Sequence, residues 1–272
     1  MRDPTLPPTR TERRALRPKL PPPPPPAREL VLEGRAFLEY GGRRVPSERV
    51  SAALATHILP ERLARMEAVL DARVTQVALG VENLHHTYNG AACVRTAEAM
   101  GLQDLVTVES ENPYPLYDEA AAPHDMADAR RITRQTDRWV SMHRLPDTAA
   151  LRAFADARGM EVWGAAPLGT RALTELPDDR PVMVLFGNES TGLLPETMAA
   201  CDGTFRIPMH GFVESFNISV SVGIVLHDLV RRVRARGTVG LDPVRRAAIH
   251  ALWVYQDVRA ADLILARALA DD

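Results

Sequence analysis

Between residues 77 and 207 the sequence alternates short apolar runs with stretches of helix length, and this alternation limits the possible folds more than any other feature. Short apolar runs suit buried strands, and the longer stretches place apolar residues at helical spacing. Strands separated by helices form βαβ units, so we predict an α/β fold with a mainly parallel sheet and helices on both faces. The predicted strands are Val77–Val81, Leu105–Val108, Trp139–Met142, Glu161–Ala165, Val182–Phe186 and Thr204–Ile207.

The predicted helices are Pro60–Arg73, Ala91–Met100, Thr148–Arg158, Pro195–Ala200 and Ile218–Arg234, with one or two more in Asp242–Leu269. With 272 residues the chain has room for one substantial α/β domain plus extensions. We divide it into an arm (1–28), an N-terminal extension with a helix (29–73), the α/β domain (74–236) and a C-terminal helical extension (237–272). Trp253 and Tyr255 either stack on the bases of a nucleic acid or, as we expect, anchor the last helices against the core.

Residues 1–28 are rich in proline and arginine. The first 26 residues hold six basic side chains against Asp3 and Glu12, although the whole chain has a net charge of −2, and they end in an unbroken proline run. Such a run favours an extended polyproline II conformation and cannot join a packed core. We expect a disordered or extended arm, which either contacts nucleic acid or only solubilises the chain.

Other features indicate where the protein works. Cys93 and Cys201 are too few for a disulfide framework and lack metal-ligand spacing. His85 and His86 have no ligand partners nearby at suitable spacing, so we expect no metal site. No apolar stretch approaches the ~20 residues of a membrane span, and the basic N-terminus has no apolar core behind it, unlike a secretory signal. These features predict a cytoplasmic protein with no membrane contact.

The first candidate site segment runs from Glu82 to Gly101, from the end of a predicted strand into a predicted helix. Asn89 is placed to cap that helix. Arg95 follows Asn89 by six residues, about one and two-thirds turns, so its side chain can point back toward the strand ends. Taken alone, Arg95 also fits an ordinary exposed helix arginine.

The second segment, Leu185–Leu193, contains a Gly-Asn-Glu-Ser-Thr-Gly turn directly after an apolar strand. Glycine at both ends of the turn lets the backbone approach a ligand closely. Open α/β sheets bind ligands at the carboxyl ends of their strands, where this turn must lie. Glu189 has a second interpretation, as a cap for the helix that begins near Pro195.

The third segment, Ile207–Ser221, follows the last predicted strand and leads into the long helix that ends near Arg234. It contains a glycine loop and then Ser215 and Asn217 just before the helix. Either of these two residues can serve as the helix N-cap.

Together the three segments, in this order and spacing, resemble the signature motifs of the SpoU/TrmH family of RNA 2′-O-ribose methyltransferases. The first keeps Asn and Arg six apart, the second has a full Gly-Asn-Glu-x-x-Gly, and the third keeps Ser-x-Asn before the long helix. The resemblance covers about Pro60 to Arg234. Within the family the chain is most similar to enzymes that methylate a tRNA D-loop guanosine (tRNA position 18), through Glu-Asn-x-His at residues 82–85 and the short basic helix before it.

This resemblance implies properties that composition alone does not. It implies a deep trefoil knot in the C-terminal part of the α/β domain, a rare exception among folds. It also implies a homodimer with the active site at the subunit interface, and S-adenosylmethionine as cofactor. By correspondence with the family, the cofactor-binding residues are Ala165, Gly187, Ile207, Met209 and Phe216.

The resemblance assigns activation of the ribose 2′-hydroxyl to Arg95, with Asn89, Glu189, Ser215 and Asn217 orienting the reacting groups. The sulfonium methyl is already activated, so the main tasks are to position the hydroxyl and to remove its proton. Arginine stays protonated in proteins. Either Arg95 loses its proton in the site, or it binds a substrate phosphate whose oxygen takes the proton.

Departures from the family pattern bear on the RNA target. Thr-Tyr replaces the usual Pro-His at residues 87–88, and Val233 occupies the position of a family arginine on the long helix. We expect RNA to be bound by Arg231, Arg232 and Arg234. The predicted function is methylation of a ribose 2′-hydroxyl in tRNA. The alternatives are ribosomal RNA or another tRNA position, and a non-catalytic RNA-binding protein that retains the fold.

Overall fold

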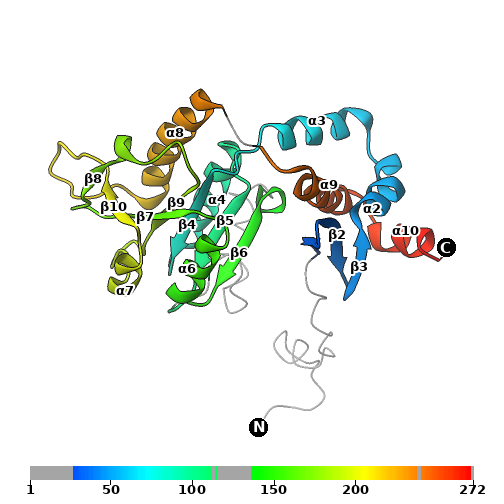
Figure 1. The fold of residues 1–272 in the computed structure, drawn as a ribbon, viewed down its shortest axis with the longest axis horizontal. Coiled ribbons are helices and arrows are strands. Elements are labelled where there is room, and N and C mark those ends of the chain that lie inside the picture. The colour runs from blue at the N-terminus through cyan, green and yellow to red at the C-terminus, as the bar shows by residue number, and fades with distance from the viewer. Residues whose placement is uncertain (1–26, 112–113, 115–135, 238–239, 271–272) are drawn as a thin grey trace, which may run out of the picture.

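The computed structural model describes residues 27–111, 114, 136–237 and 240–270. They form two units, which lie side by side in Figure 1. The sheet unit comprises the described residues from 74 to 237, and the end unit comprises 27–73 and 241–270. Most of the arm predicted for residues 1–28 lies outside the described residues.

A seven-stranded parallel sheet forms the centre of the sheet unit. Its order is β6-β5-β4-β9-β7-β10-β8, so β9 lies between two strands that precede it in the chain. The strands are β4 (Val77–Glu82), β5 (Asp104–Val108), β6 (Ser141–Leu145), β7 (Glu161–Ala165), β8 (Arg171–Ala172), β9 (Val182–Phe186) and β10 (Gly203–Arg206). β4, β5 and β9 are buried along their whole length, as apolar strands covered on both faces must be.

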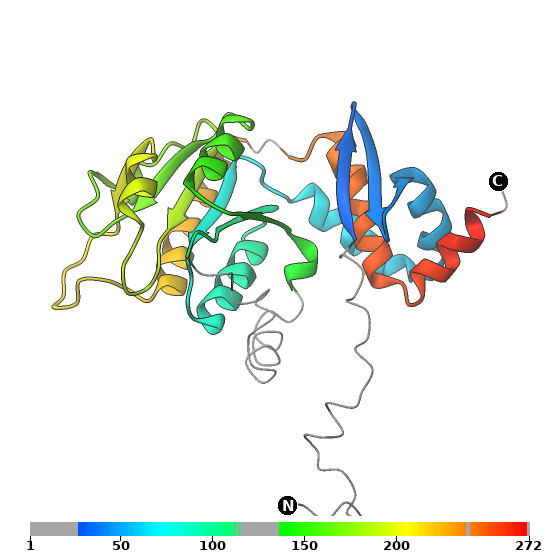
Figure 2. The same ribbon diagram turned by 90° about the horizontal axis from the view of Figure 1, so that it is seen from below.

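Helices cover both faces of this sheet, as predicted (Figures 1 and 2). On one face α4 (Thr87–Ala99) and α8 (Ile218–Arg236) pack against the strands. On the other face lie α6 (Thr148–Asp156) and α7 (Pro195–Ala199). The strand alternation supplies a separate apolar core to each face, because successive side chains of a strand point to opposite sides.

The end unit is built from both ends of the described chain. Its N-terminal part contains β1 (Arg28–Leu32), β2 (Arg35–Tyr40), β3 (Arg43–Pro46), α2 (Ser47–Leu54), η1 (Ala55–His57) and α3 (Pro60–Asp71). Its C-terminal part contains α9 (Pro243–Asp257) and α10 (Ala261–Ala268). β1, β2 and β3 form an antiparallel sheet that shares one hydrophobic core with these helices. The two segments that the sequence analysis treats as separate extensions therefore pack together.

The aromatic residues of α9 anchor the end unit, as expected. Trp253 is 1% exposed and its ring meets Trp139 edge to face at 5.4 Å between centroids. Trp139 belongs to the 3₁₀ helix η3 (Thr136–Trp139), so the strand predicted to begin there is wrong at its start. Tyr255 packs near Tyr40, with ring centroids 5.4 Å apart.

Polar contacts join the two units at the amino ends of the sheet strands. Arg73, 1% exposed, donates to the backbone oxygens of Leu102 (3.1 Å) and Trp139 (2.8 Å). Arg245 of α9 donates to Asp104, the first residue of β5, which also bonds His143 at 2.7 Å. The end unit therefore lies at the edge of the sheet opposite the carboxyl ends of the strands. No helix among the described residues has the length and apolarity needed to cross a bilayer.

Candidate active site

Three loops meet at the carboxyl ends of the sheet strands, where open α/β sheets bind their ligands. They follow β4, β9 and β10, and a cavity of about 650 Å³ lies between them. Its lining includes the following residues predicted for catalysis or cofactor binding: Asn89, Ala165, Gly187, Glu189, Ile207, Met209, Ser215, Phe216 and Asn217.

Asn89 connects all three loops. Its Nδ2 donates to Glu189 Oε1 at 2.8 Å, and its Oδ1 accepts from Asn217 Nδ2 at 3.0 Å. The prediction that Asn89 caps its helix is wrong, because α4 begins at Thr87 and His86 takes the N-cap position. Asn89 lies inside the first turn, and its side chain binds the other two motifs instead of the helix backbone.

Glu189 is a hydrogen-bonded carboxylate in the cavity wall. Besides Asn89, the backbone N–H of His85 donates to its Oε2 at 3.3 Å. Burial raises the pKa of Glu189, but the hydrogen bonds from Asn89 and the backbone lower it by more, so the net pKa lies below its ordinary value. Glu189 is therefore ionised at neutral pH. It does not cap α7, whose N-cap residue Leu194 has a different carboxylate partner.

That partner is Glu82, to which the sequence analysis gave no role. Glu82 is fully buried at the end of β4 and accepts from Leu194 N at 2.8 Å and from the Thr197 hydroxyl. Burial raises the pKa of Glu82. A carboxylate at the end of an otherwise apolar strand was the available signal. Nearby, Asn188 Nδ2 donates to the Asn83 carbonyl at 2.7 Å, a further hydrogen bond between the first two motifs.

Gly187 lies where the second motif loop folds back on itself. Asn188 and Gly192 exchange two backbone hydrogen bonds of 3.0 and 2.9 Å, which close the turn. A Cβ atom at Gly187 would lie 2.1 Å from the backbone carbon of Gly192 and 2.1 Å from Leu193 N. Only glycine therefore allows this turn to close.

The third motif provides both a helix cap and a cavity wall. Asn217 is the N-cap of α8 and accepts from Ser219 N at 2.8 Å, while its Nδ2 reaches Asn89. Ser215 and Phe216 line the cavity, and Phe216 remains 40% exposed. Both interpretations of Asn217, cap and site residue, are therefore compatible.

Arg95 does not line this cavity. It is exposed on α4, six residues beyond Asn89. Six residues advance a helix axis by about 9 Å and turn it by roughly 240°, so the two side chains leave the helix on different sides. Within one chain Arg95 therefore lies outside the lining of the cavity that holds the Asn89–Glu189–Asn217 cluster.

The arginines predicted to bind RNA lie far from the cavity along α8. Arg231 follows Asn217 by 14 residues, about 20 Å of helix. Arg231 and Arg234 are exposed, and Arg234 donates to Ala72 O at 2.8 Å. Arg232 is different. Its side chain is 16% exposed and donates to Asp228 and to the backbone oxygens of Leu173 and Leu176.

In chemical terms the cavity has the volume of a small-molecule site and mixes apolar walls with amide, hydroxyl and ionised carboxylate groups. It can bind and orient a polar organic cofactor against a second reactant. Among the described residues no group of three His, Cys, Asp or Glu side chains could hold a metal ion. The rings of His85 and His86 meet edge to face at 5.2 Å.

The chain is also similar to known proteins. Residues 76–227 match the model of the SpoU rRNA Methylase family. The chain is 30% identical over 183 residues to a tRNA (guanosine(18)-2′-O)-methyltransferase of Borreliella burgdorferi, covering 66% of this chain and 78% of the relative. It is 30% identical to the 23S rRNA (guanosine-2′-O-)-methyltransferase RlmB of a Burkholderia species, covering 68% of each. Among solved structures, the TrmH/SpoU tRNA modifying enzyme of Aquifex aeolicus superposes with a TM-score of 0.63 at 25% identity, covering 73% of this chain and 98% of that one.

Proposed function

This chain belongs to the SpoU methylase family, and on that basis we propose that it transfers a methyl group from S-adenosylmethionine to a ribose 2′-hydroxyl of tRNA. The observation that carries the proposal is the Asn89–Glu189–Asn217 cluster, which joins all three motif loops at one cavity. The names of similar proteins from several bacteria specify guanosine 18 of tRNA, which supports a D-loop guanosine as the target.

The cavity suits this cofactor in size and chemistry. Its volume of about 650 Å³ lies within the range of cofactor sites. Ile207, Met209 and Phe216 would provide apolar surface for the cofactor, and the backbone that closes around Gly187 would provide polar contacts. When bound, the cofactor supplies an activated methyl group.

The side chains of this protein then have to orient the ribose and deal with one proton. Asn89, Glu189 and Asn217 hold one another and so fix the loops on either side of the reacting atoms. Ser215 presents a hydroxyl in the same wall. In methyl transfer the ribose oxygen would bond to the methyl carbon while the bond from that carbon to the sulfonium sulfur breaks. The hydroxyl proton would leave either to an Arg95 that has first lost its own proton, or to a substrate phosphate oxygen that a protonated Arg95 binds.

We propose that Arg95 acts in the cavity of a second copy within a homodimer. Two observations support this arrangement. Arg95 is exposed and does not line the cavity of its own chain. Large apolar side chains are also exposed near the N-termini of α4 and α8, namely Tyr88 (51%), Phe216 (40%) and Val220 (48%). Exposed apolar surface of this kind marks contact sites between proteins.

The proposed catalytic domain is residues 74–236, and we propose that its C-terminal part forms the deep trefoil knot of the family. The strand order supports the knot, because β9 lies between β4 and β7 although it follows both in the chain. This order places the loops after β9 and β10 at the same cavity.

Mixing two inactive variants tests the shared site. Arg95→Ala should cut turnover by at least ~10²-fold, the lower range for a lost proton-transfer group, with cofactor affinity unchanged. Asn217→Ala should be inactive because it alters the cavity of the subunit that carries the substitution. When equal amounts of the two variants exchange subunits at random, about half of the dimers are mixed. In each mixed dimer one of the two sites combines an intact cavity with an intact Arg95, so about a quarter of wild-type activity should return. A mixture that stays inactive would place Arg95 in its own subunit's site.

The RNA target is tested with labelled cofactor. Methyl transfer to tRNA transcripts with guanosine 18 should exceed transfer to transcripts in which that guanosine is replaced. The similarity to RlmB makes 23S ribosomal RNA the second candidate, and nucleoside mass spectrometry of both RNA classes, from cells with and without the protein, separates the two. Absence of transfer to any RNA would contradict the proposed activity.

A further inference from the structure

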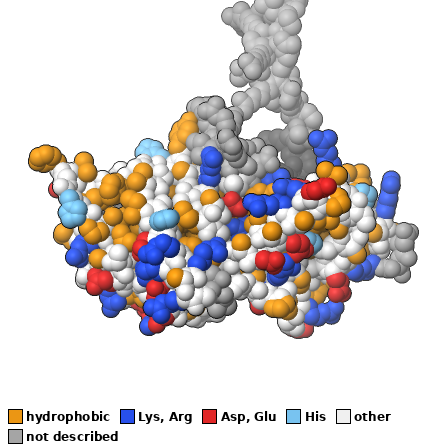
Figure 3. All heavy atoms as spheres, turned by 90° about the horizontal axis from the view of Figure 1, so that it is seen from above, with side chains coloured by type: hydrophobic (Ala, Val, Ile, Leu, Met, Phe, Trp, Pro, Cys, Tyr) orange, Lys and Arg blue, Asp and Glu red, His pale blue; other side chains and the backbone are white. Residues whose placement is uncertain are grey.

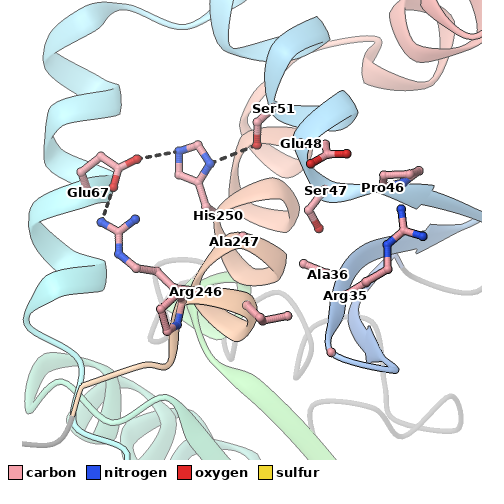
Figure 4. Close-up of a pocket in the computed structure, with 13 residues that line it drawn as sticks. Arg35, Ala36, Pro46, Ser47, Glu48, Ser51, Glu67, Arg246, Ala247 and His250 are labelled. Atoms are coloured by element: carbon pink, nitrogen blue, oxygen red, sulfur yellow. Dashed lines mark hydrogen bonds and ion pairs between the residues drawn. The ribbon is translucent and has the colours of Figure 1, made fainter.

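A second cavity, of about 570 Å³, lies in the end unit. Figure 4 shows it between β2, the junction of β3 and α2, and the helices α3 and α9. It belongs to the edge of the molecule opposite the motif loops, so the methyl-transfer site does not account for it. Both ends of the described chain contribute walls to it.

One wall contains a buried hydroxyl group without a partner. Ser47, the first residue of α2, is 2% exposed, and its Oγ makes no hydrogen bond within the described part of the chain. In Figure 4 its side chain points into the cavity. Buried hydroxyl groups in proteins are nearly always hydrogen-bonded, because leaving one unpaired is costly. The Ser47 hydroxyl is therefore a hydrogen-bonding group of this wall for which the described residues provide no partner.

A second hydroxyl in the same wall is already held in place. Ser51 Oγ lies 3.1 Å from His250 Nδ1, and His250 Nε2 lies 3.2 Å from Glu67 Oε1 (Figure 4). With a neutral ring, Nε2–H donates to Glu67 and Nδ1 accepts the Ser51 proton. Burial lowers the pKa of His250, which favours the neutral ring. Ser51 then offers its oxygen as an acceptor, whereas Ser47 can donate.

The charges around the cavity do not favour a simple anion. The lining contains two arginines, Arg35 and Arg246, and two carboxylates, Glu48 and Glu67, so its positive and negative charges are equal in number. Arg246 is itself bonded to Glu67 and to Asp71. A phosphate group would therefore meet two carboxylates. The remaining lining consists of small apolar side chains, namely Ala36, Pro46, Pro243, Val244 and Ala247.

A neutral, flat ligand with both donors and acceptors on its edge fits this lining, and a nucleobase has these properties. We propose that the end-unit cavity binds the base of an unpaired nucleotide, with its faces against the apolar side chains and its edge against Ser47 and Ser51. This inference rests on the proposed function, because an RNA substrate would supply the nucleotide. Proteins recognise RNA mainly through such unpaired bases. A free nucleoside presents the same chemistry.

Two variants and a matched control test the proposal. Ser47→Ala removes only the free hydroxyl, and Ala247→Leu fills the cavity from an exposed position of α9. Ala52→Leu makes the same change at an exposed position of α2 outside the cavity. The dissociation constant of an unmodified tRNA transcript is measured for each protein, and saturation-transfer NMR follows free guanosine, adenosine, cytidine and uridine.

We expect Ser47→Ala to weaken tRNA binding roughly fivefold, the value of one neutral hydrogen bond, and Ala247→Leu to weaken it at least as much. Ala52→Leu should bind like the wild type. The melting temperature of Ser47→Ala should not fall, because no internal hydrogen bond is lost, so its result stands even if Ala247→Leu is unstable. Turnover at saturating tRNA should be unchanged.

The outcomes separate the possibilities. Wild-type tRNA affinity in Ser47→Ala and Ala247→Leu, with no nucleoside bound, would overturn the proposal. Nucleoside binding that Ala247→Leu abolishes, with unchanged tRNA affinity, would assign the cavity to a free nucleoside and overturn the RNA source. A third outcome is that the wild-type protein transfers no methyl group but the variants still bind tRNA more weakly than it does. That result would support this inference and contradict the proposed function.

Discussion

Gly187 shows how a single residue determines the geometry of the second motif loop. A methyl group at this position would collide with the backbone of Gly192 and Leu193, 2.1 Å away. We therefore expect Gly187→Ala to open the turn and abolish S-adenosylmethionine binding, measured by calorimetry. Gly211→Ala is the matched control, because a Cβ there meets no atom within 4 Å. Equal cofactor affinity in both variants would show that the cofactor does not depend on this turn.

The sequence showed which residues belong to the site more fully than it showed the contacts that they make. The motif positions of Asn89, Glu189 and Asn217 were sufficient to place them in one site. The sequence could not show that Asn89 bonds both of the others instead of capping its helix, since that depends on how three loops distant in sequence meet. Glu82 was missed for the same reason: its partners, Leu194 and Thr197, lie more than 100 residues away.

At the scale of elements, α8 combines a structural side and an exposed side. Arg232 neutralises Asp228 and Asp178 and donates to two backbone oxygens, whereas Arg231 is 64% exposed. On the face drawn in Figure 3, arginine and acidic side chains are interspersed. Attraction of RNA to this face would therefore depend on individual exposed arginines and not on the total charge of the face.

The three arginines of α8 should respond differently to replacement by alanine. Arg231→Ala and Arg234→Ala should each weaken RNA binding and reduce the slope of log affinity against log salt by about one, as expected for a lost phosphate contact. Arg232→Ala should instead lower the free energy of unfolding by about 2 kcal/mol, because it leaves charged and backbone partners unpaired. RNA titrations at several salt concentrations, with urea unfolding, check both. A slope change confined to Arg232→Ala would reverse the assignment.

The elements themselves differed in how predictable they were. β4, β5 and β9 are continuous apolar strands, and their bounds agree with the prediction to within one residue. β1, β2 and β3 were not assigned, because one face of this small sheet is partly exposed and its strands mix arginine and glutamate with apolar residues. β8 contains only two residues, too few to give any periodicity.

At the scale of the whole molecule, Asp104 is central to the contact between the units. Burial raises the pKa of Asp104, but hydrogen bonds from His143 and Arg245 lower it by more, so the net pKa lies well below its ordinary value. A depressed pKa contributes stability above the unfolded pKa of about 3.9, and this stability is lost as pH falls through the folded pKa. The contact should therefore weaken only in acid.

Asp104→Asn tests this contact. It leaves Arg245 without its carboxylate, so the free energy of unfolding at pH 7 should fall by about 3 kcal/mol, as for other broken buried ion pairs. The variant should also lose part of the acid dependence expected for the wild type below about pH 4. Asp179→Asn, in the exposed pair with Arg180, should change neither quantity. Urea unfolding at several pH values gives both measurements, and equal effects of the two substitutions would contradict the assigned role.

The long-range assembly was the least predictable part of the structure. The helical periodicity of residues 242–269 predicted helices correctly, and Trp253 was expected to anchor them. Nothing local indicates that α9 packs against α2, β1 and β2, which are about 200 residues away. The two extensions expected from the sequence are therefore one unit in the structure.

The composition of the end unit also has a consequence for biosynthesis. β1 to α3 are the first described elements to leave the ribosome, and α9 and α10 are the last. The sheet unit can fold as soon as α8 has emerged, whereas Leu38, Val50 and Leu54 lack their cover until residues 243–270 follow. A chain truncated after residue 240 and released from the ribosome should thus carry a folded sheet unit beside an N-terminal segment that chaperones bind and proteases cleave.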